Sequence, residues 1–196
     1  MAIVFIGMFI LGLFLGSFLL VVVDRSVRGE TFVTGRSRCE HCGHTLTPTE
    51  LIPIVSWVLQ KGKTRCCGKF LSWRYPLAEI FVGIGSALVV YTSLLPVISG
   101  TTIIQAILHL LVFWTLSVLF FSDLFYQVMS FPILLIGVFI SVLMPLLSGF
   151  LLHHITGTFF LPNIASAIGS FLFFFLLWLF SKGKAMGDGD MYLGAI

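Results

Sequence analysis

AIVFIGMFILGLFLGSFLLVVV, residues 2–23, is an apolar run without a charged side chain, and it decides the fold. About 20 such residues are enough for a helix to cross the hydrocarbon core of a bilayer. The run has no basic lead, is longer than the apolar core of a secretory signal and is followed by no small-residue cleavage site. We therefore predict a retained membrane helix over residues 3–23. Within it, Gly12 and Gly16 form a GxxxG spacing, which allows a second helix to approach closely.

The rest of the chain has the same apolar character. Of its 196 residues, 58% are hydrophobic and 10% are charged, and the mean hydropathy of +1.10 lies outside the range of soluble domains. Backbone polar groups in hydrocarbon must be satisfied within each spanning segment, which requires helices. We therefore predict an all-α, polytopic membrane helix bundle with five spans and the start of a sixth. The four further spans cover roughly 77–98, 103–122, 132–151 and 161–180, and Met191–Ile196 opens the sixth.

The basic residues predict the orientation of this bundle. Nine of the eleven Lys and Arg residues fall within 24–75, and the other two are Lys182 and Lys184. The positive-inside rule places the loop in the cytoplasm and the N-terminus outside. The chain then divides into a first span (1–23), a cytoplasmic basic loop (24–75) and a membrane bundle (76–196). Counting spans returns Lys182 and Lys184 to the cytoplasmic side, in agreement with the same rule.

Two acids stand at the ends of predicted spans. Asp123 ends one apolar run, and Asp190 closes the stretch Gly187-Asp188-Gly189-Asp190. Alternation of the spans puts both acids at the cytoplasmic leaflet. Ionisable groups at membrane depth are costly, so they mark candidate functional sites. Two neighbouring carboxylates share a proton, so one acts as a base toward water and the other as an acid toward a peptide carbonyl. Gly187 and Gly189 allow the backbone to come close to a substrate.

Other roles for these acids stay open on the sequence alone. An Asp at a helix end is often solvated, or caps a neighbouring helix. Intramembrane acids also serve as proton or cation relays, so the alternative function is a transporter or channel subunit that uses Asp123 and Asp190. A non-catalytic assembly factor is a third hypothesis. Two further hydrolytic classes lack their motifs, because neither His-Glu-x-x-His nor Gly-x-Ser-x-Gly occurs.

All four cysteines lie in the basic loop, as Cys39-Glu-His-Cys42 and the adjacent pair Cys66-Cys67. Two such clusters predict a tetrahedral, structural zinc site that folds a small loop. A reducing cytoplasm favours a metal over disulfides, and reduced structural thiols are the alternative. Because adjacent cysteines rarely ligate one ion together, one of the nearby histidines is an alternative ligand.

The same loop also predicts partners. Between the cysteine clusters, Leu51–Leu59 is apolar, too short to cross a bilayer, and contains Trp57. Such a segment beside basic residues suits the membrane surface and its anionic lipid headgroups. Nucleic acid is not predicted as a partner, because the positive-inside rule already accounts for the basic charge.

A series of short motifs, in order along nearly the whole chain, resembles those of the bacterial type IV prepilin peptidases, the GxGD class of membrane aspartic proteases. Each motif is weak alone, but their order and spacing together are specific. The motifs are Gly16-Ser-Phe18 with Asp24-Arg25, Arg36-Ser-x-Cys39-x-x-Cys42, Leu51-Ile-Pro-Ile-x-Ser-Trp57, Gly62-Lys-x-Arg-x-Cys67, Arg74-Tyr-Pro-Leu-x-Glu79, Asp123-Leu124 and Gly187-x-Gly-Asp190.

The resemblance implies that Asp123 and Asp190 are the catalytic pair of a multi-pass peptidase of the bacterial inner membrane. It implies cleavage of the short basic leader of prepilins or pseudopilins at the cytoplasmic face, typically just after a glycine. Many members then methylate the new amino terminus with S-adenosylmethionine, and the products serve type IV pili, type II secretion or DNA uptake. Thr64 departs from the family pattern, because it stands where the second C-x-x-C would begin.

Overall fold

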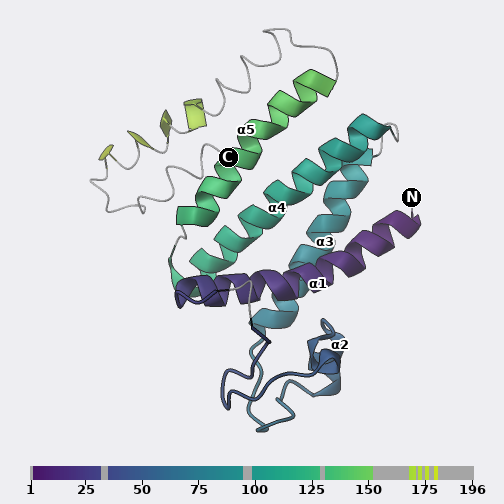
Figure 1. The fold of residues 1–196 in the computed structure, drawn as a ribbon, viewed down its shortest axis with the longest axis vertical. Coiled ribbons are helices and arrows are strands. Elements are labelled where there is room, and N and C mark those ends of the chain that lie inside the picture. The colour runs from purple at the N-terminus through teal and green to yellow at the C-terminus, as the bar shows by residue number, and fades with distance from the viewer. Residues whose placement is uncertain are drawn as a thin grey trace. The chain divides into compact units, whose positions relative to one another are not determined.

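The computed structural model describes residues 2–31, 35–94, 99–128 and 131–151, with short pieces between 168 and 180 (Figure 1). In these residues the secondary structure is helical, and pairing between extended segments is limited to two isolated bridges. The elements are α1 (Ala2–Val27), the 3-10 helix η1 (Pro48–Leu51), α2 (Val55–Leu59), α3 (Arg74–Leu94), α4 (Gly100–Tyr126) and α5 (Phe131–Leu151).

Three helices, α1, α3 and α4, are long and apolar enough to cross a membrane. This confirms the predicted class, a mainly helical membrane protein. The predicted span 132–151 coincides with α5. The predicted span 161–180 is described only in short helical pieces, and the start of the predicted sixth span lies outside the described residues.

The chain forms two compact units. The first contains residues 1–92 and 120–128, and the second contains residues 93–119 and 129–196. The C-terminal turns of α4 therefore belong to the same unit as α1, α3 and the loop between them. The contacts of the candidate site described below lie within this first unit.

Helices α1 and α3 approach each other through glycine. A Cβ added at Gly12 would lie 2.8 Å from the Cα of Gly83, and a Cβ added at Gly16 would lie 2.8 Å from the Cα of Glu79. Cβ atoms essentially never stand that close to a backbone atom, so only glycine permits this crossing. The close approach that a GxxxG spacing allows therefore occurs here, between α1 and α3.

Proline and a left-handed residue mark the helix ends. Pro76 lies in the first turn of α3 and Pro132 in the first turn of α5, where a missing N–H leaves no bond unmade. Helix α4 closes with Gln127 in the left-handed region (φ 53°), and the Gln127 N–H still donates to the Asp123 carbonyl at 2.9 Å. The last turn of α4 thus holds the backbone of Asp123 in helical geometry.

A strained turn precedes α2 in the loop. Ile54 has φ 60° and ψ −51°, and the Val55 N–H donates to the Pro53 carbonyl at 2.5 Å. This is a γ-turn of the rare, strained hand, which a β-branched residue seldom adopts. The buried carboxylate of Glu79 on α3 accepts the Ile54 N–H at 2.7 Å. A single hydrogen bond from the membrane helix therefore supports the turn.

Candidate functional site

Asp123 is the only member of the predicted acid pair that can be placed. It is exposed in the last turn of α4, and its carboxylate has no hydrogen bond or ion pair to any other described residue. Asp190, with Gly187 and Gly189, lies outside the described residues. The pairing of the two acids therefore stays a prediction.

A polar cluster ties three helix ends together beside Asp123. The Tyr126 hydroxyl, at the end of α4, donates to Asp24 Oδ1 at 2.6 Å. Arg74, at the start of α3, donates from Nη1 to the Tyr126 hydroxyl at 3.0 Å, and its Nη2 lies 3.5 Å from Asp24 Oδ2. Asp24 is 9% exposed near the end of α1. Its charge is thus compensated, as burial of a carboxylate requires. The cluster places the Asp123 end of α4 at the same end of the unit as the loop.

The cluster extends into the loop through Glu40. Both the Arg74 guanidinium and the Tyr75 hydroxyl donate to Glu40 Oε1. Partial burial raises the pKa of Glu40, but the Tyr75 hydrogen bond and the charge of Arg74 outweigh it and hold the pKa below its usual value. Glu40 therefore stays ionised at neutral pH. It belongs to the Cys39-Glu-His-Cys42 segment, so the cysteine loop is anchored on α3.

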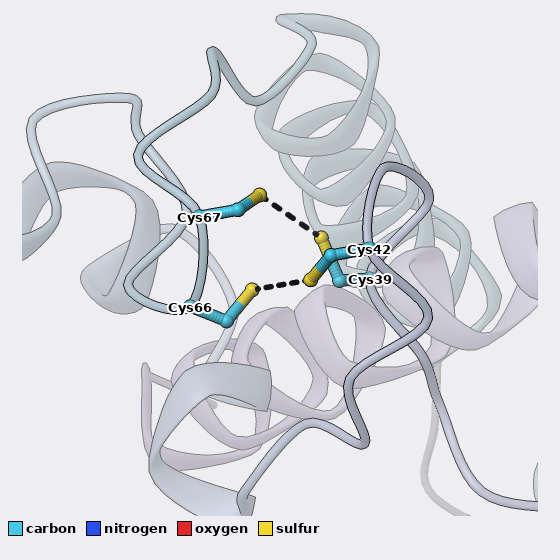
Figure 2. A group of neighbouring side chains, drawn as sticks. All are labelled: Cys39, Cys42, Cys66 and Cys67. Atoms are coloured by element: carbon cyan, nitrogen blue, oxygen red, sulfur yellow. Dashed lines mark hydrogen bonds between the residues drawn. The ribbon is translucent and has the colours of Figure 1, made fainter.

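The four cysteines come together in space (Figure 2). Their Sγ atoms all lie within 4.8 Å of one another. The Cys39 and Cys67 sulfurs are 3.9 Å apart, and the Cys42 and Cys66 sulfurs are 3.3 Å apart. All four thiols are free. A tetrahedron with Zn–S bonds of about 2.3 Å has S···S edges of about 3.8 Å, so the spacing fits a four-thiolate zinc site.

The protonation of the thiols also fits a cation site. Hydrogen bonds from the Thr64 hydroxyl and from the backbone of Lys69 lower the pKa of Cys67 to about 6. The hydrogen bond between Cys66 and Cys42, together with burial, raises the pKa of Cys66 to about 12. Four crowded thiols cannot all ionise without a compensating charge, and a divalent cation supplies that charge when it displaces the protons.

Two backbone turns of the same shape present these cysteines. In the first, the Gly43 N–H donates to the Cys39 carbonyl at 2.9 Å, and in the second, the Gly68 N–H donates to the Thr64 carbonyl at 2.8 Å. Both glycines are left-handed, with φ of 70° and 69°. Thr64 thus occupies the position that Cys39 holds in the first turn.

Cys66 supplies the fourth thiol from a different position of its turn. Its counterpart in the first turn is His41, whose Nε2 lies 3.3 Å from the Phe70 carbonyl. His41 is therefore engaged with the backbone, and the cluster of possible ligands among the described residues consists of cysteines. The adjacency of Cys66 and Cys67, which the sequence suggested as an obstacle, does not keep either sulfur out of the group.

Sequence reasoning did not assign a role to Glu40, Arg74 or Tyr126. A signal was present, because Asp24 and Arg74 are opposite charges at the ends of two predicted spans. Charges at such positions seek partners when they leave water. Tyr126 and Glu40 carried no comparable signal, since a tyrosine at an interface and a glutamate in a loop are ordinary.

A cavity of about 670 Å³ lies between α1, α3 and the loop. Its lining includes Asp24, Glu40, Tyr75 and the buried Glu79, along with arginines of the loop such as Arg36. The cavity therefore combines carboxylates with cationic groups within one unit, next to the polar cluster.

Comparison with known proteins places the chain. Residues 10–93 match the family described as Bacterial Peptidase A24 N-terminal domain. A prepilin leader peptidase/N-methyltransferase of Dickeya chrysanthemi is 30% identical over an alignment of 219 residues, which covers 96% of this chain and 71% of the relative. Proteins of the same name are 46% identical over 77 residues in Myxococcus xanthus and 47% identical over 73 residues in Bacillus subtilis.

Coverage of these relatives is uneven. The alignments cover 39% of this chain and 23% of the M. xanthus protein, and 37% of this chain and 29% of the B. subtilis protein. No solved structure gives a significant match. The relationship to the D. chrysanthemi protein spans nearly the whole chain, and it shows that the chain belongs to the prepilin leader peptidase/N-methyltransferase family.

Proposed function

We propose that this chain is a membrane aspartic endopeptidase that removes the leader of type IV prepilins or pseudopilins. The observation that carries the proposal is the relationship to the D. chrysanthemi prepilin leader peptidase/N-methyltransferase over 96% of the chain. The position of Asp123 at the loop end of the first unit supports it, because leader cleavage at the cytoplasmic face needs an acid there. The alternative, a transporter or channel relay, is not favoured by the names of the relatives.

Asp123 and Asp190 form the proposed catalytic pair. The two carboxyl groups hold one proton between them, and the ionised one removes a proton from a water molecule. The water oxygen then attacks the scissile carbonyl carbon, while the protonated carboxyl donates a hydrogen bond to the carbonyl oxygen. The leaving amine takes up a proton as the C–N bond breaks. Gly187 and Gly189 have no side chains of their own, so a peptide can come close to the backbone at these two positions.

The proposed topology follows from charge and span counting. The protein crosses the bacterial inner membrane five times and begins a sixth crossing, with the N-terminus outside and residues 24–75 in the cytoplasm. Residues 1–23 form the first span and residues 76–196 the peptidase bundle. The apolar segment around Leu51–Leu59 rests on the lipid surface, and its exposed Val55, Val58 and Leu59 side chains suit that position.

Two groups complete the proposal. Cys39, Cys42, Cys66 and Cys67 would hold a structural zinc ion, which crosslinks the two turns of the loop. A methyl group would be added to the amino terminus that cleavage exposes, as the second half of the relatives' name indicates, and S-adenosylmethionine is its proposed donor. The proposed partners are prepilin-like substrates and membrane lipid, and nucleic acid is not among them.

The test is a cleavage assay on full-length protein in lipid with a prepilin substrate. Asp123→Asn and Asp190→Asn each remove one member of the pair, and we expect cleavage to fall by about 10²–10⁴-fold in both. Asp188→Asn is the matched control, because it changes the same charge two residues from Asp190 and should leave cleavage near the wild-type rate. Intact cleavage in either Asp123→Asn or Asp190→Asn, with normal membrane insertion, would refute the pair. Mass analysis of the product tests methylation separately.

A further inference from the structure

We propose that Arg74 is a positioning residue that couples the four-cysteine cluster to the end of α4 that carries Asp123. Metal binding in the loop and order at the end of α4 would then stabilise each other. The inference rests on the proposed function only for the catalytic role of Asp123. The contacts themselves lie within the first unit and are independent of that role.

The loop side of this coupling is Glu40. It directly follows Cys39, which is buried, and it lies two residues before Cys42. Its Oε1 atom accepts hydrogen bonds from the Arg74 guanidinium and the Tyr75 hydroxyl. A metal ion that draws Cys39 and Cys42 together fixes the backbone between them, and this backbone sets the position of the Glu40 carboxylate.

The helix side is Tyr126, the last residue of α4. Its hydroxyl accepts from Arg74 Nη1 at 3.0 Å and donates to Asp24 Oδ1 at 2.6 Å. Tyr126 follows Asp123 by three residues, so both lie in the same helical turn. A contact that holds Tyr126 therefore restrains fraying at Asp123, where a helix otherwise loses order first.

Arg74 joins the two sides because of its planar, forked donors. One guanidinium reaches the Tyr126 hydroxyl through Nη1, and Asp24 and Glu40 through Nη2. Its side chain is 20% exposed, and that of Glu40 is 31% exposed, so water screens these contacts only in part. A lysine has a single ammonium group and cannot span the three partners in this geometry.

Thermodynamic reciprocity gives the sharpest test. If metal binding orders the end of α4, then loosening the end of α4 must weaken metal binding by the same factor. Tyr126→Phe removes only the hydroxyl, far from the cysteines in sequence. We expect it to weaken the affinity for Co²⁺ or Zn²⁺ by about five-fold or more, within the usual range of couplings between sites. Arg74→Gln should weaken it at least as much, and Arg74→Lys should restore part of the loss.

The measurement is competition with a chromogenic chelator on full-length protein in detergent. Tyr91→Phe is the matched control, because Tyr91 is an exposed residue of α3 whose ring contacts Phe5. It should leave metal affinity unchanged. Wild-type affinity in Tyr126→Phe, or an equal loss in Tyr91→Phe, would overturn the proposal. If Arg74→Gln fails to fold, as judged by circular dichroism, the Tyr126→Phe result decides alone.

Hydrogen exchange tests the coupling in the opposite direction, from metal binding in the loop to order at the end of α4. Removal of metal from the wild-type protein should speed amide exchange in residues 120–128 by about five-fold or more, through the same coupling. In Arg74→Gln these amides should exchange at one rate with and without metal. Equal amide exchange rates in residues 120–128 of the wild-type protein with and without metal would reject the coupling. Neither measurement needs cleavage, so failure of this inference is distinguishable from failure of the proposed peptidase activity.

Discussion

At the scale of single residues, the second turn of the loop has its thiol at Cys66 and a hydroxyl at Thr64, where the first turn has the thiol of Cys39. This difference decides the chemistry of the loop. Thr64 holds the position in the second turn that Cys39 holds in the first, and Cys66 provides the thiol that Thr64 lacks. The Thr64 hydroxyl lies 3.1 Å from Cys67 Sγ. It is therefore placed to donate a hydrogen bond to a thiolate, as outer-shell groups do around metal ligands.

Cys66→Ser tests whether Cys66 is a metal ligand. The variant should bind Co²⁺ with about three quarters of the thiolate-to-metal absorption of the wild-type protein, because one of four thiolates is gone. Metal affinity should fall by at least about 100-fold, the upper end of the effect of an outer-shell change. His41→Asn is the control, since His41 is engaged by the Phe70 carbonyl. If His41→Asn changed the cobalt spectrum and Cys66→Ser did not, the fourth ligand would be the histidine.

Thr64→Val tests the hydroxyl beside Cys67. The substitution keeps the volume and removes the donor, so we expect metal affinity to fall by about ten-fold with an unchanged four-thiolate spectrum. Thr64→Ser restores the hydroxyl and should restore affinity. Equal affinities in the valine and serine variants would show that the hydroxyl plays no part.

At the scale of elements, hydropathy located the helices but not their ends. The predicted spans 3–23 and 103–122 correspond to α1 (Ala2–Val27) and α4 (Gly100–Tyr126). Each helix continues past the acid, Asp24 or Asp123, that ends its apolar stretch. Asp24 stays helical because Arg74 and Tyr126 compensate its carboxylate. Such partners come from distant parts of the chain, so the hydropathy of the apolar run itself could not indicate where the helix ends.

The α1–α3 crossing gives a prediction at the same scale. Gly16→Ala adds a Cβ that would lie 2.8 Å from the backbone of Glu79, so the helices must separate. Overpacking of this kind costs about 1–3 kcal/mol, and we expect a lower midpoint of thermal unfolding in detergent. Gly7→Ala is matched in chemistry and helix, and its Cβ would meet nothing within 4 Å. Equal midpoints for the two variants would contradict the close crossing.

The turn at Ile54 depends on a second contact between elements. Glu79→Ala leaves the half-buried Ile54 N–H without its acceptor, and loss of such a hydrogen bond costs about 1 kcal/mol. We expect faster limited proteolysis between Pro48 and Leu59. Glu79→Gln retains a side-chain oxygen and should protect this segment nearly as well as the wild-type residue. Rapid cleavage in Glu79→Gln would mean that the charge of Glu79, and not its hydrogen bond, supports the turn.

At the scale of the whole molecule, the sequence predicted the helical membrane class and the gathering of the cysteines, and the structure bears out both. It could not predict the cluster around Arg74, because the partners of a buried charge depend on how distant helix ends meet. Asp123 and Asp190 remain joined only by the family resemblance and by span counting. Their place at the cytoplasmic leaflet is an inference from charge bias and span counting, and the orientation of the loop, on which it depends, has a direct test.

Trypsin can report the orientation of the loop, because nine of the eleven Lys and Arg residues lie in 24–75. We expect trypsin to cleave there in inside-out membrane vesicles and to leave the loop intact in right-side-out vesicles. A marker protein on each face controls for vesicle sealing. Cleavage only in right-side-out vesicles would place the loop outside and reverse the proposed topology.

The division of the cysteines between two turns has a consequence for biogenesis. The first turn leaves the ribosome well before Cys66 and Cys67, so it cannot complete its ligand set while the chain is that short. Arg74 follows the second turn by only a few residues. The loop therefore gains its last cysteines just before synthesis of α3 begins, so the two turns can come together only once the chain has reached the start of that helix.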